Sequence, residues 1–234
     1  MLMILRWPAC RNVRDVGGLP LVAGGMTALG VLVRSDCHDR LGSAGRAELD
    51  RYGVTAIIDL RDDSERSRYP SPYQGSARYR PVPVDVDAID GHYGSLGETY
   101  VAILRQRGVR FAAAVTAIAA TDGCAVVHCH AGRDRTGLVA AVTLAAVGVE
   151  RSAIVADYMR SVPPGPSVVS VATPGRMRTF LAASMSDIEA ALDYLDGVGG
   201  ARSYLRDGGL SDDLASRLDC RLRAAVDPVY EGGA

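Results

Sequence analysis

The sequence predicts an α/β fold in which a central, mostly parallel sheet is flanked by helices and followed by an all-helical C-terminal third. Short β-branched runs alternate with longer helical stretches as far as residue 150, and this order is typical of a parallel sheet covered on both faces. Beyond that point the apolar spacing is helical. We therefore expect one domain over residues 1–234, with an α/β core in 1–150 and a helical part in 151–234.

The first predicted elements alternate in type. Residues 43–52 have the pattern of a short helix that ends at Gly53, and a strand over 54–58 follows at once. Residues 80–84 form a second candidate strand, whose prolines suit the edge of a sheet. A helix over 111–120 precedes the next strand.

The C-terminal third has helical patterns separated by clear breaks. A helix over 152–160 is followed by the Pro-Pro-Gly-Pro stretch at 163–166, which ends it. A second helix is expected over 186–195. Ser211 is expected to cap the last helix, in which Leu214, Leu218 and Leu222 share one face.

A ten-residue block over 128–137 is the most informative segment of the chain. It reads His-Cys-His-Ala-Gly-Arg-Asp-Arg-Thr-Gly and lies between the apolar runs 125–127 and 138–149. The first run is typical of a buried strand, and the second has the length of a buried helix. A turn between a strand and a helix start presents unpaired backbone N–H groups, and the helix dipole adds positive charge there. The block therefore predicts an anion site sized for a phosphate.

Four residues of this block indicate the chemistry of the site. Cys129 supplies a sulfur nucleophile, because a helix start beside an arginine generally favours the thiolate form of cysteine. Arg135 has the planar fork that can hold two phosphoryl oxygens, which lysine lacks. Gly132 allows the torsions of a tight loop, and the hydroxyl of Thr136 can stabilise the sulfur as a leaving group. These roles suit attack on phosphorus through a phosphocysteine intermediate.

Further residues are predicted to line or support the phosphate loop. Four are expected to surround the bound phosphate: His130, Ala131, Gly132 and Arg133. His128 is expected to brace the loop by a hydrogen bond to the backbone, with proton transfer as the alternative. Arg14 and Asp15 are expected to form a buried pair behind the loop, with substrate contact as the alternative.

The block resembles the signature of the protein tyrosine phosphatase superfamily, His-Cys-x5-Arg-Thr. Its longer form, Cys-x-Ala-Gly-[Lys/Arg]-Asp-Arg-Thr-Gly, is similar to that of the bacterial branch that includes the mycobacterial protein tyrosine phosphatase B. Other segments resemble the same branch, in order along the chain: 12–18, 32–35, 58–61, 156–161 and 204–210. The resemblance spans roughly residues 6 to 224.

This resemblance implies an enzyme that hydrolyses phosphotyrosine in proteins, with phosphoserine, phosphothreonine and phosphoinositides as further candidate substrates. It also implies a lid over the site, which in this chain falls at 163–195. Arg133 resembles the basic residue of relatives that accept lipid phosphates. The alternative is a catalytically poor module that binds phosphorylated partners through the same loop.

The general acid is not decided by the sequence. Expulsion of a phenolate or alkoxide is slow without a proton donor, and the chain lacks the Trp-Pro-Asp tripeptide that carries this donor in familiar tyrosine phosphatases. Asp134 is a candidate because it lies inside the loop, with a structural pairing to Arg14 or Arg133 as the alternative. Asp85 and Asp87 are the other candidates, with a solvated acidic turn as the alternative.

Composition narrows the class of protein. The formal net charge of −1 argues against a nucleic-acid-binding protein, and the five scattered cysteines do not fit a secreted disulfide framework. The longest apolar run, 137–149, is too short for a transmembrane segment, and the N-terminus lacks the pattern of a cleaved signal peptide. We expect a cytoplasmic protein, or one exported without a cleaved signal, that uses no metal or other cofactor. The sequence leaves its oligomeric state open.

Overall fold

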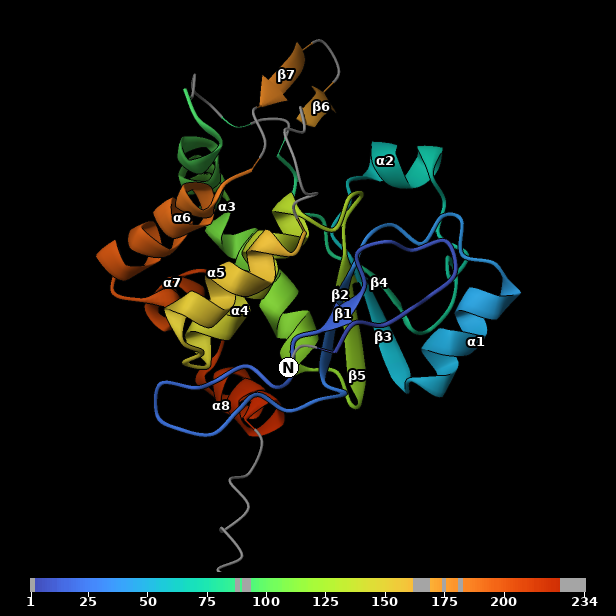
Figure 1. Cartoon of the computed structure of the whole chain (residues 1–234), viewed down its shortest axis with the longest axis horizontal. Coiled ribbons are helices and arrows are strands. Elements are labelled where there is room, and N and C mark those ends of the chain that lie inside the picture. Colours follow the sequence, from blue (N-terminus) through green and yellow to red (C-terminus); the bar gives the residue numbers. More distant parts are fainter. Residues whose placement is uncertain are drawn as a thin grey trace, which may run out of the picture.

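A five-stranded sheet forms the centre of the fold (Figure 1). The computed structural model describes residues 3–86, 89, 94–161, 169–173, 176–180 and 183–223. The strands are β1 (Arg14–Asp15), β2 (Leu32–Ser35), β3 (Val54–Asp59), β4 (Tyr79–Pro81) and β5 (Cys124–His128). They lie in the order β1-β2-β5-β3-β4, with β1 antiparallel at one edge and the other four parallel. The mostly parallel sheet is confirmed, and β4 lies at an edge, where its proline is tolerated.

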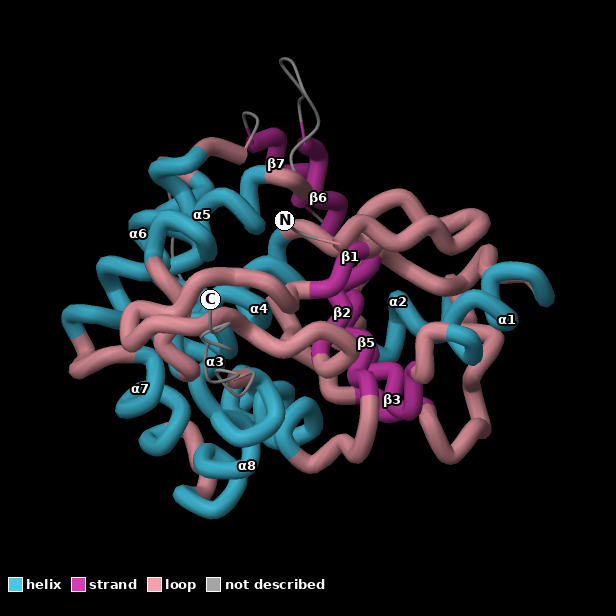
Figure 2. Tube along the Cα trace, turned by 60° about the horizontal axis from the view of Figure 1, so that its bottom comes forward, coloured by secondary structure: helices cyan, strands magenta, loops and turns pink. Residues whose placement is uncertain are grey.

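Helices cover both faces of this sheet (Figure 2). On one side lie α1 (Ser43–Arg51) and α2 (Asp63–Arg68). On the other lie α3 (Leu96–Ala119), α4 (Asp134–Ala146), α5 (Arg151–Met159), α6 (Met185–Gly197), α7 (Ala201–Asp207) and α8 (Asp212–Leu222). No helix among the described residues has the length and apolar character needed to cross a membrane.

The alternation of side chains along the strands separates two cores. On β5, Ala125 and Val127 belong to the larger core, which includes residues of α3 to α8. Cys124 and Val126 belong to the smaller core on the opposite face, together with Leu49 of α1. Successive side chains of a strand point to opposite faces, so β5 is buried along its whole length and holds the site that follows it in a fixed position.

Local sequence signals determine several element boundaries. The helix predicted over 43–52 is α1, and Gly53 beyond its end has a φ of +80°, which favours glycine. Ser211 caps α8, because its hydroxyl accepts the backbone N–H of Leu214 at 3.3 Å. Leu218 and Leu222 are buried on the inner face of the same helix.

Two elements differ from the prediction. The helix expected over 111–120 is the second half of α3, which begins at Leu96 and has non-helical torsions at Arg107. The C-terminal third is helical as predicted, but it also contains the antiparallel hairpin of β6 (Val169–Thr173) and β7 (Arg176–Phe180). A β-branched run favours a strand, but it does not specify the partner that completes a hairpin.

The lid predicted at 163–195 overlaps this hairpin and most of α6. Residues 162–168, 174–175 and 181–182 lie outside the described residues. The lid therefore stays a prediction.

Candidate active site

The block predicted to bind phosphate leaves the sheet at its central strand. The parallel register places Ser35 and Asp59 on either side of His128, the last residue of β5. These positions form the C-terminal edge of the sheet, where ligand sites of parallel sheets occur. The loop 129–133 rises from the middle of this edge and leads directly into α4.

The loop turns its carbonyl groups outward. The backbone N–H of Cys37 donates to the carbonyl of His130 at 2.9 Å. The side-chain amide of Asn12 donates to the carbonyls of Ala131 and Gly132 at 3.3 and 3.0 Å. The outer side of the loop is therefore hydrogen-bonded to the N-terminal segment and to the residues after β2.

The opposite side of the loop carries backbone donors that no described residue engages. The backbone N–H groups of residues 130–133 have no hydrogen-bond partner among the described residues. The dipole of α4 adds positive charge at the same place. A row of unpaired N–H groups at a helix start is the geometry of a phosphate or anion site.

Gly132 makes this loop conformation possible. Its φ of +70° lies in the left-handed region, and a Cβ at this position would lie 2.5 Å from the carbonyl oxygen of Ser35. The same Cβ would lie 2.7 Å from the backbone nitrogen of Asp36. Both the torsion and the contact with backbone require glycine.

The predicted nucleophile and its hydroxyl neighbour are both buried at the base of the loop. Cys129 is 3 % exposed and directly follows β5. Thr136, in the first turn of α4, is fully buried. Its hydroxyl has no hydrogen-bond partner among the described residues, so it is available to a group bound in the loop.

Arg135 is held by a carboxylate that the sequence reasoning missed. Its Nη1 and Nη2 donate to the two carboxylate oxygens of Glu65 at 2.5 and 2.6 Å. Burial opposes the charged guanidinium, but the hydrogen bonds to Glu65 and the nearby Cys129 sulfur raise the pKa of Arg135 above its usual value. The guanidinium is therefore a fixed cation beside the loop.

Glu65 is itself fixed by the start of α2. Asp62 caps this helix by accepting the N–H of Glu65 at 2.8 Å, and Glu65 accepts the N–H of Asp62 at 3.1 Å. This is a capping box, for which Asp-x-x-Glu at 62–65 is the sequence signal. The signal predicts a helix start, but not the contact with Arg135.

Asp134 is paired inside the protein. Its two carboxylate oxygens accept from Nε and Nη2 of Arg133, each at 3.0 Å. One of them also accepts the hydroxyl of Tyr100, which in turn lies 2.7 Å from the hydroxyl of Tyr158. Asp134 thus joins α3, α4 and α5, and its partner is Arg133, one of the two alternatives for a structural pairing.

His128 contacts the loop backbone. Its Nδ1 lies 3.1 Å from the carbonyl oxygen of Cys129, and its Nε2 lies 3.6 Å from a carboxylate oxygen of Asp59. Burial lowers the pKa of His128 below its usual value, which favours the neutral ring at neutral pH. These contacts are those expected of a residue that braces the loop.

The predicted pair of Arg14 and Asp15 is wrong. Arg14 donates from Nε to Asp157 at 2.6 Å, whereas Asp15 accepts the backbone N–H groups of Gly17 and Gly30 at 2.6 and 2.7 Å. Neighbouring residues of a strand point to opposite faces, so these two side chains cannot meet. Arg14 does lie behind the phosphate loop, but its carboxylate partner comes from α5.

Two further residues behind the loop were not singled out from the sequence. Arg34 donates to the carbonyl of Gly132 at 3.0 Å and to Asp157 at 2.5 Å. Both residues lie in segments that resemble the phosphatase branch, 32–35 and 156–161. That resemblance was the available signal, although it does not show which side chains meet.

Comparison with known proteins identifies the family of this site. The family model described as "Tyrosine phosphatase family" matches residues 5–224. The chain belongs to this family. It is 32 % identical to the triple specificity protein phosphatase PtpB of Mycobacterium tuberculosis, over 90 % of the chain and 96 % of that protein. The family assignment favours a phosphatase over a binding module.

Two further matches are a curated protein and a solved structure. The phosphatase is 32 % identical to a tyrosine-protein phosphatase of Nostoc commune, over 67 % of the chain and 52 % of that protein. It aligns with the crystal structure of P. aeruginosa TpbA at 18 % identity and a TM-score of 0.37, over 94 % of each chain.

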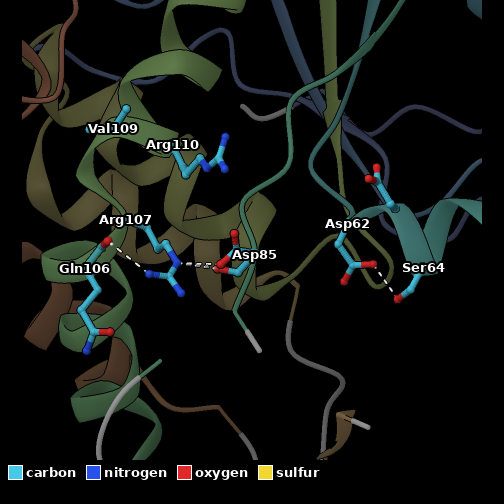
Figure 3. A pocket seen from close by; sticks show the side chains of 8 residues that line it. Asp62, Ser64, Asp85, Gln106, Arg107, Val109 and Arg110 are labelled. Atoms are coloured by element: carbon cyan, nitrogen blue, oxygen red, sulfur yellow. Dashed lines mark hydrogen bonds and ion pairs between the residues drawn. The ribbon is translucent and has the colours of Figure 1, made fainter. Parts of the chain in front are cut away.

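Asp85, another acid candidate, lies beside a cavity of about 640 Å³ next to α2 and α3 (Figure 3). Nε of Arg107 donates to its carboxylate at 2.6 Å, and Asp62 and Ser64 line the same cavity. Among the described residues, Asp85 makes no hydrogen bond or ion pair with the phosphate loop. Asp87 lies outside the described residues.

His130 lines a second cavity, of about 690 Å³, on the side of the loop that faces the N-terminal segment. Its ring lies 5.2 Å from that of Tyr69, which lines the same cavity. Within the described part of the phosphatase, no cluster of three or more His, Cys, Asp or Glu side chains could hold a metal ion.

Proposed function

We propose that this phosphatase hydrolyses phosphotyrosine through a phosphocysteine intermediate formed on Cys129. The observation that carries the proposal is the orientation of the loop that follows Cys129. Its carbonyls are bound on the outside, and the N–H groups of residues 130–133, on the other side, have no partner in the described part of the chain. Such preorganised donors stabilise the negative charge of a phosphoryl group during transfer.

In the proposed reaction the sulfur of Cys129 attacks phosphorus, and the bond from phosphorus to the leaving oxygen breaks. The leaving oxygen takes up a proton and departs as the tyrosine hydroxyl. Water then attacks phosphorus, and the S–P bond breaks to release inorganic phosphate and the thiolate. The hydroxyl of Thr136, which no described residue engages, supports the sulfur in this second step.

Arg135 can bind Glu65 and the phosphoryl group together. Glu65 uses the edge of the guanidinium formed by Nη1 and Nη2. The planar group has a second edge, formed by Nε–H and one further N–H, which can donate to two phosphoryl oxygens. We therefore assign Glu65 the role of orienting Arg135.

Two of the three carboxyl groups considered as acids, those of Asp134 and Asp85, have other partners. A proton transfer from Asp134 requires its contacts with Arg133 and Tyr100 to break. Asp85 is bound to Arg107. We therefore propose that Asp134 holds the first turn of α4 to its neighbours. Kinetic comparison of variants of Asp85, Asp87 and Asp134 identifies the proton donor.

We propose a substrate range that extends beyond phosphotyrosine. Arg133, four residues after the nucleophile, adds a second guanidinium, but its side chain is 6 % exposed and bound to Asp134, so contact with a second phosphate requires it to turn away from Asp134. The relative from M. tuberculosis is named a triple specificity phosphatase, which supports a range beyond phosphotyrosine. A panel of phosphotyrosine, phosphoserine and phosphothreonine peptides and phosphoinositides measures this range.

We also propose that residues 1–234 form one domain. Support comes from the larger core, in which Val127 of β5 belongs to the same cluster as Leu192 of α6 and Leu222 of α8. A core shared in this way favours unfolding as one unit.

Cys129→Ser tests the proposed mechanism directly. Turnover of para-nitrophenyl phosphate should be abolished, because a serine hydroxyl is a far weaker nucleophile than a thiolate. Phosphate binding should persist, since the N–H groups and Arg135 remain. A variant that retains about a tenth of the wild-type kcat, a loss of only about 1.4 kcal/mol in the barrier, rules out the phosphocysteine intermediate.

A further inference from the structure

Three charged side chains form a buried cluster directly behind the phosphate loop. We call Arg14, Arg34 and Asp157 the rear clamp. Each carboxylate oxygen of Asp157 accepts a hydrogen bond from one guanidinium: Oδ1 from Nε of Arg14 at 2.6 Å and Oδ2 from Nη1 of Arg34 at 2.5 Å. The three residues are at most 3 % exposed, and the hydroxyl of Ser161 accepts from both guanidiniums at 2.7 and 3.0 Å.

The rear clamp reaches the loop by two routes that end on one atom. Nη2 of Arg34 donates to the carbonyl of Gly132 at 3.0 Å. Arg14 donates to the side-chain oxygen of Asn12, and the side-chain nitrogen of Asn12 donates to the carbonyl of Gly132 at 3.0 Å. The hydrogen bonds from Asn12 through Arg14, Asp157 and Arg34 to Gly132 therefore form a closed ring.

Stability alone does not explain this cluster. Two guanidiniums share one carboxylate, and Nε of Arg34 is buried without a hydrogen-bond partner among the described residues. Burial and the neighbouring Arg34 lower the pKa of Arg14 to about 10, although Asp157 opposes this shift. Apolar side chains in place of buried ion pairs are often neutral or stabilising.

The contacted carbonyl decides the direction of the peptide groups in the loop. A peptide unit is planar, so the carbonyl of Gly132 and the N–H of Arg133 point in opposite directions. While Arg34 and Asn12 hold this carbonyl outward, that N–H points to the side where phosphate is expected. If the peptide turned over, a carbonyl oxygen would face the phosphate and repel it.

We propose that Arg34 and Asp157 are positioning residues for phosphate binding and phosphoryl transfer. Arg34 holds the loop carbonyls outward, and Asp157 holds Arg34. The inference deepens the proposed function and rests on it, because it concerns the same phosphate site.

Charge and position make opposite predictions for Asp157→Asn. Removal of this carboxylate increases the positive charge behind the loop, which by itself strengthens the binding of an anion. Loss of the hydrogen bond that fixes Arg34 weakens binding instead. We expect inorganic phosphate to bind several-fold more weakly to Asp157→Asn, because fixed donors are more effective than mobile ones.

The experiment uses isothermal titration of inorganic phosphate into the full chain carrying Cys129→Ser, so that binding is measured without turnover. We expect Arg34→Met to weaken phosphate binding at least about tenfold, or about 1.4 kcal/mol, and Arg34→Lys to recover part of the loss. Leu205→Ala is the matched control, because Leu205 is fully buried in α7 and its truncation destabilises the fold without contacting the loop. Its phosphate affinity should equal that of the parent.

The same substitutions in the chain that retains Cys129 test the reaction. Arg34→Met should lower kcat and kcat/KM for para-nitrophenyl phosphate, while Leu205→Ala should leave both near wild type at temperatures where it is folded. Phosphate affinity within twofold of the parent in Arg34→Met overturns the proposal, and so does tighter binding to Asp157→Asn. If Arg34→Met does not fold, unchanged affinity in Arg34→Lys and Asp157→Asn has the same meaning. A wild-type chain without turnover contradicts the proposed function instead, and the phosphate titration still tests the clamp.

Discussion

Arginine meets carboxylate on both sides of the phosphate loop, with opposite consequences. In front, Arg135 faces Glu65 in a one-to-one pair whose carboxylate side chain is 24 % exposed. Behind, Arg14 and Arg34 share Asp157, whose side chain is 2 % exposed. In the proposed reaction the front pair keeps one edge of its guanidinium for a ligand, whereas the rear clamp also directs donors to the protein carbonyls of Asp157 and Gly132. Under the proposed mechanism, exposure and spare donors, rather than residue type, distinguish the arginine that binds substrate from the arginines that shape the site.

The largest expected effect on stability comes from the rear. Asp157→Asn should lower the free energy of unfolding by about 3–5 kcal/mol, because it leaves two buried guanidiniums without a counter-charge. Glu65→Gln should cost about 1 kcal/mol or less, because the front pair is partly exposed. Urea denaturation of both variants measures the difference. Equal losses would remove the distinction between the two pairs.

Substitution of Arg135 in the front pair should have the largest effect on catalysis. Arg135→Lys keeps the charge but loses the planar fork, so kcat/KM for para-nitrophenyl phosphate should fall at least about a hundredfold, or about 2.7 kcal/mol. Arg151→Lys is the control, since Arg151 joins α5 to Asp193 and Asp196 on α6 and makes no contact with the loop. A fall of only a few-fold in Arg135→Lys would show that its guanidinium does not touch the transferred group.

Asp134 tests whether a residue inside the loop can still be structural. Asp134→Asn should lower stability by about 2 kcal/mol, because hydrogen bonds to a charged group are lost. Its kcat/KM should fall equally for a phosphotyrosine peptide and for an activated aryl phosphate that needs no proton.

A selective loss on the peptide, with a flattened alkaline limb in the pH–rate profile, would instead identify Asp134 as the acid. The same two substrates with Asp85→Asn and Asp87→Asn complete the comparison. If no variant shows leaving-group dependence, water or substrate is the proton source.

The smallest predicted effect is a difference in acid sensitivity. Burial raises the pKa of Asp157, but Arg34 and Arg14 lower it further, so the net shift in the folded protein is downward. In the unfolded chain the pKa of this carboxyl group is near 3.9. The unfolded chain therefore binds a proton at Asp157 more readily than the folded protein does. Stability contributed by Asp157 is therefore present above pH ~4 and is lost as the pH falls below it, at most about 1.4 kcal/mol per pH unit. Urea midpoints between about pH 5 and 2.5 should fall less steeply in Asp157→Asn than in the wild type. Parallel slopes would contradict an ionised Asp157.

The sequence alone determined the features that depend on neighbouring residues. Ten consecutive positions, 128–137, indicated the strand end, the tight glycine loop and the helix start, because these signals act within a few residues. The same holds for the cap at Ser211 and for the end of α1 at Gly53. Periodicity over longer runs indicated the mostly parallel sheet and the helical C-terminal region.

Only the tertiary structure decided which charged groups meet. Glu65 lies 70 residues before Arg135, and Asp157 lies 143 and 123 residues after its two arginine partners. A chain with 27 acidic and 26 basic side chains offers many equivalent pairs, and sequence proximity favoured the wrong one, Arg14 with Asp15. The order of strands in the sheet and the packing that brings Glu65 of α2 and Asp157 of α5 to the loop selected the pairs, because an ion pair needs its two groups within about 4 Å.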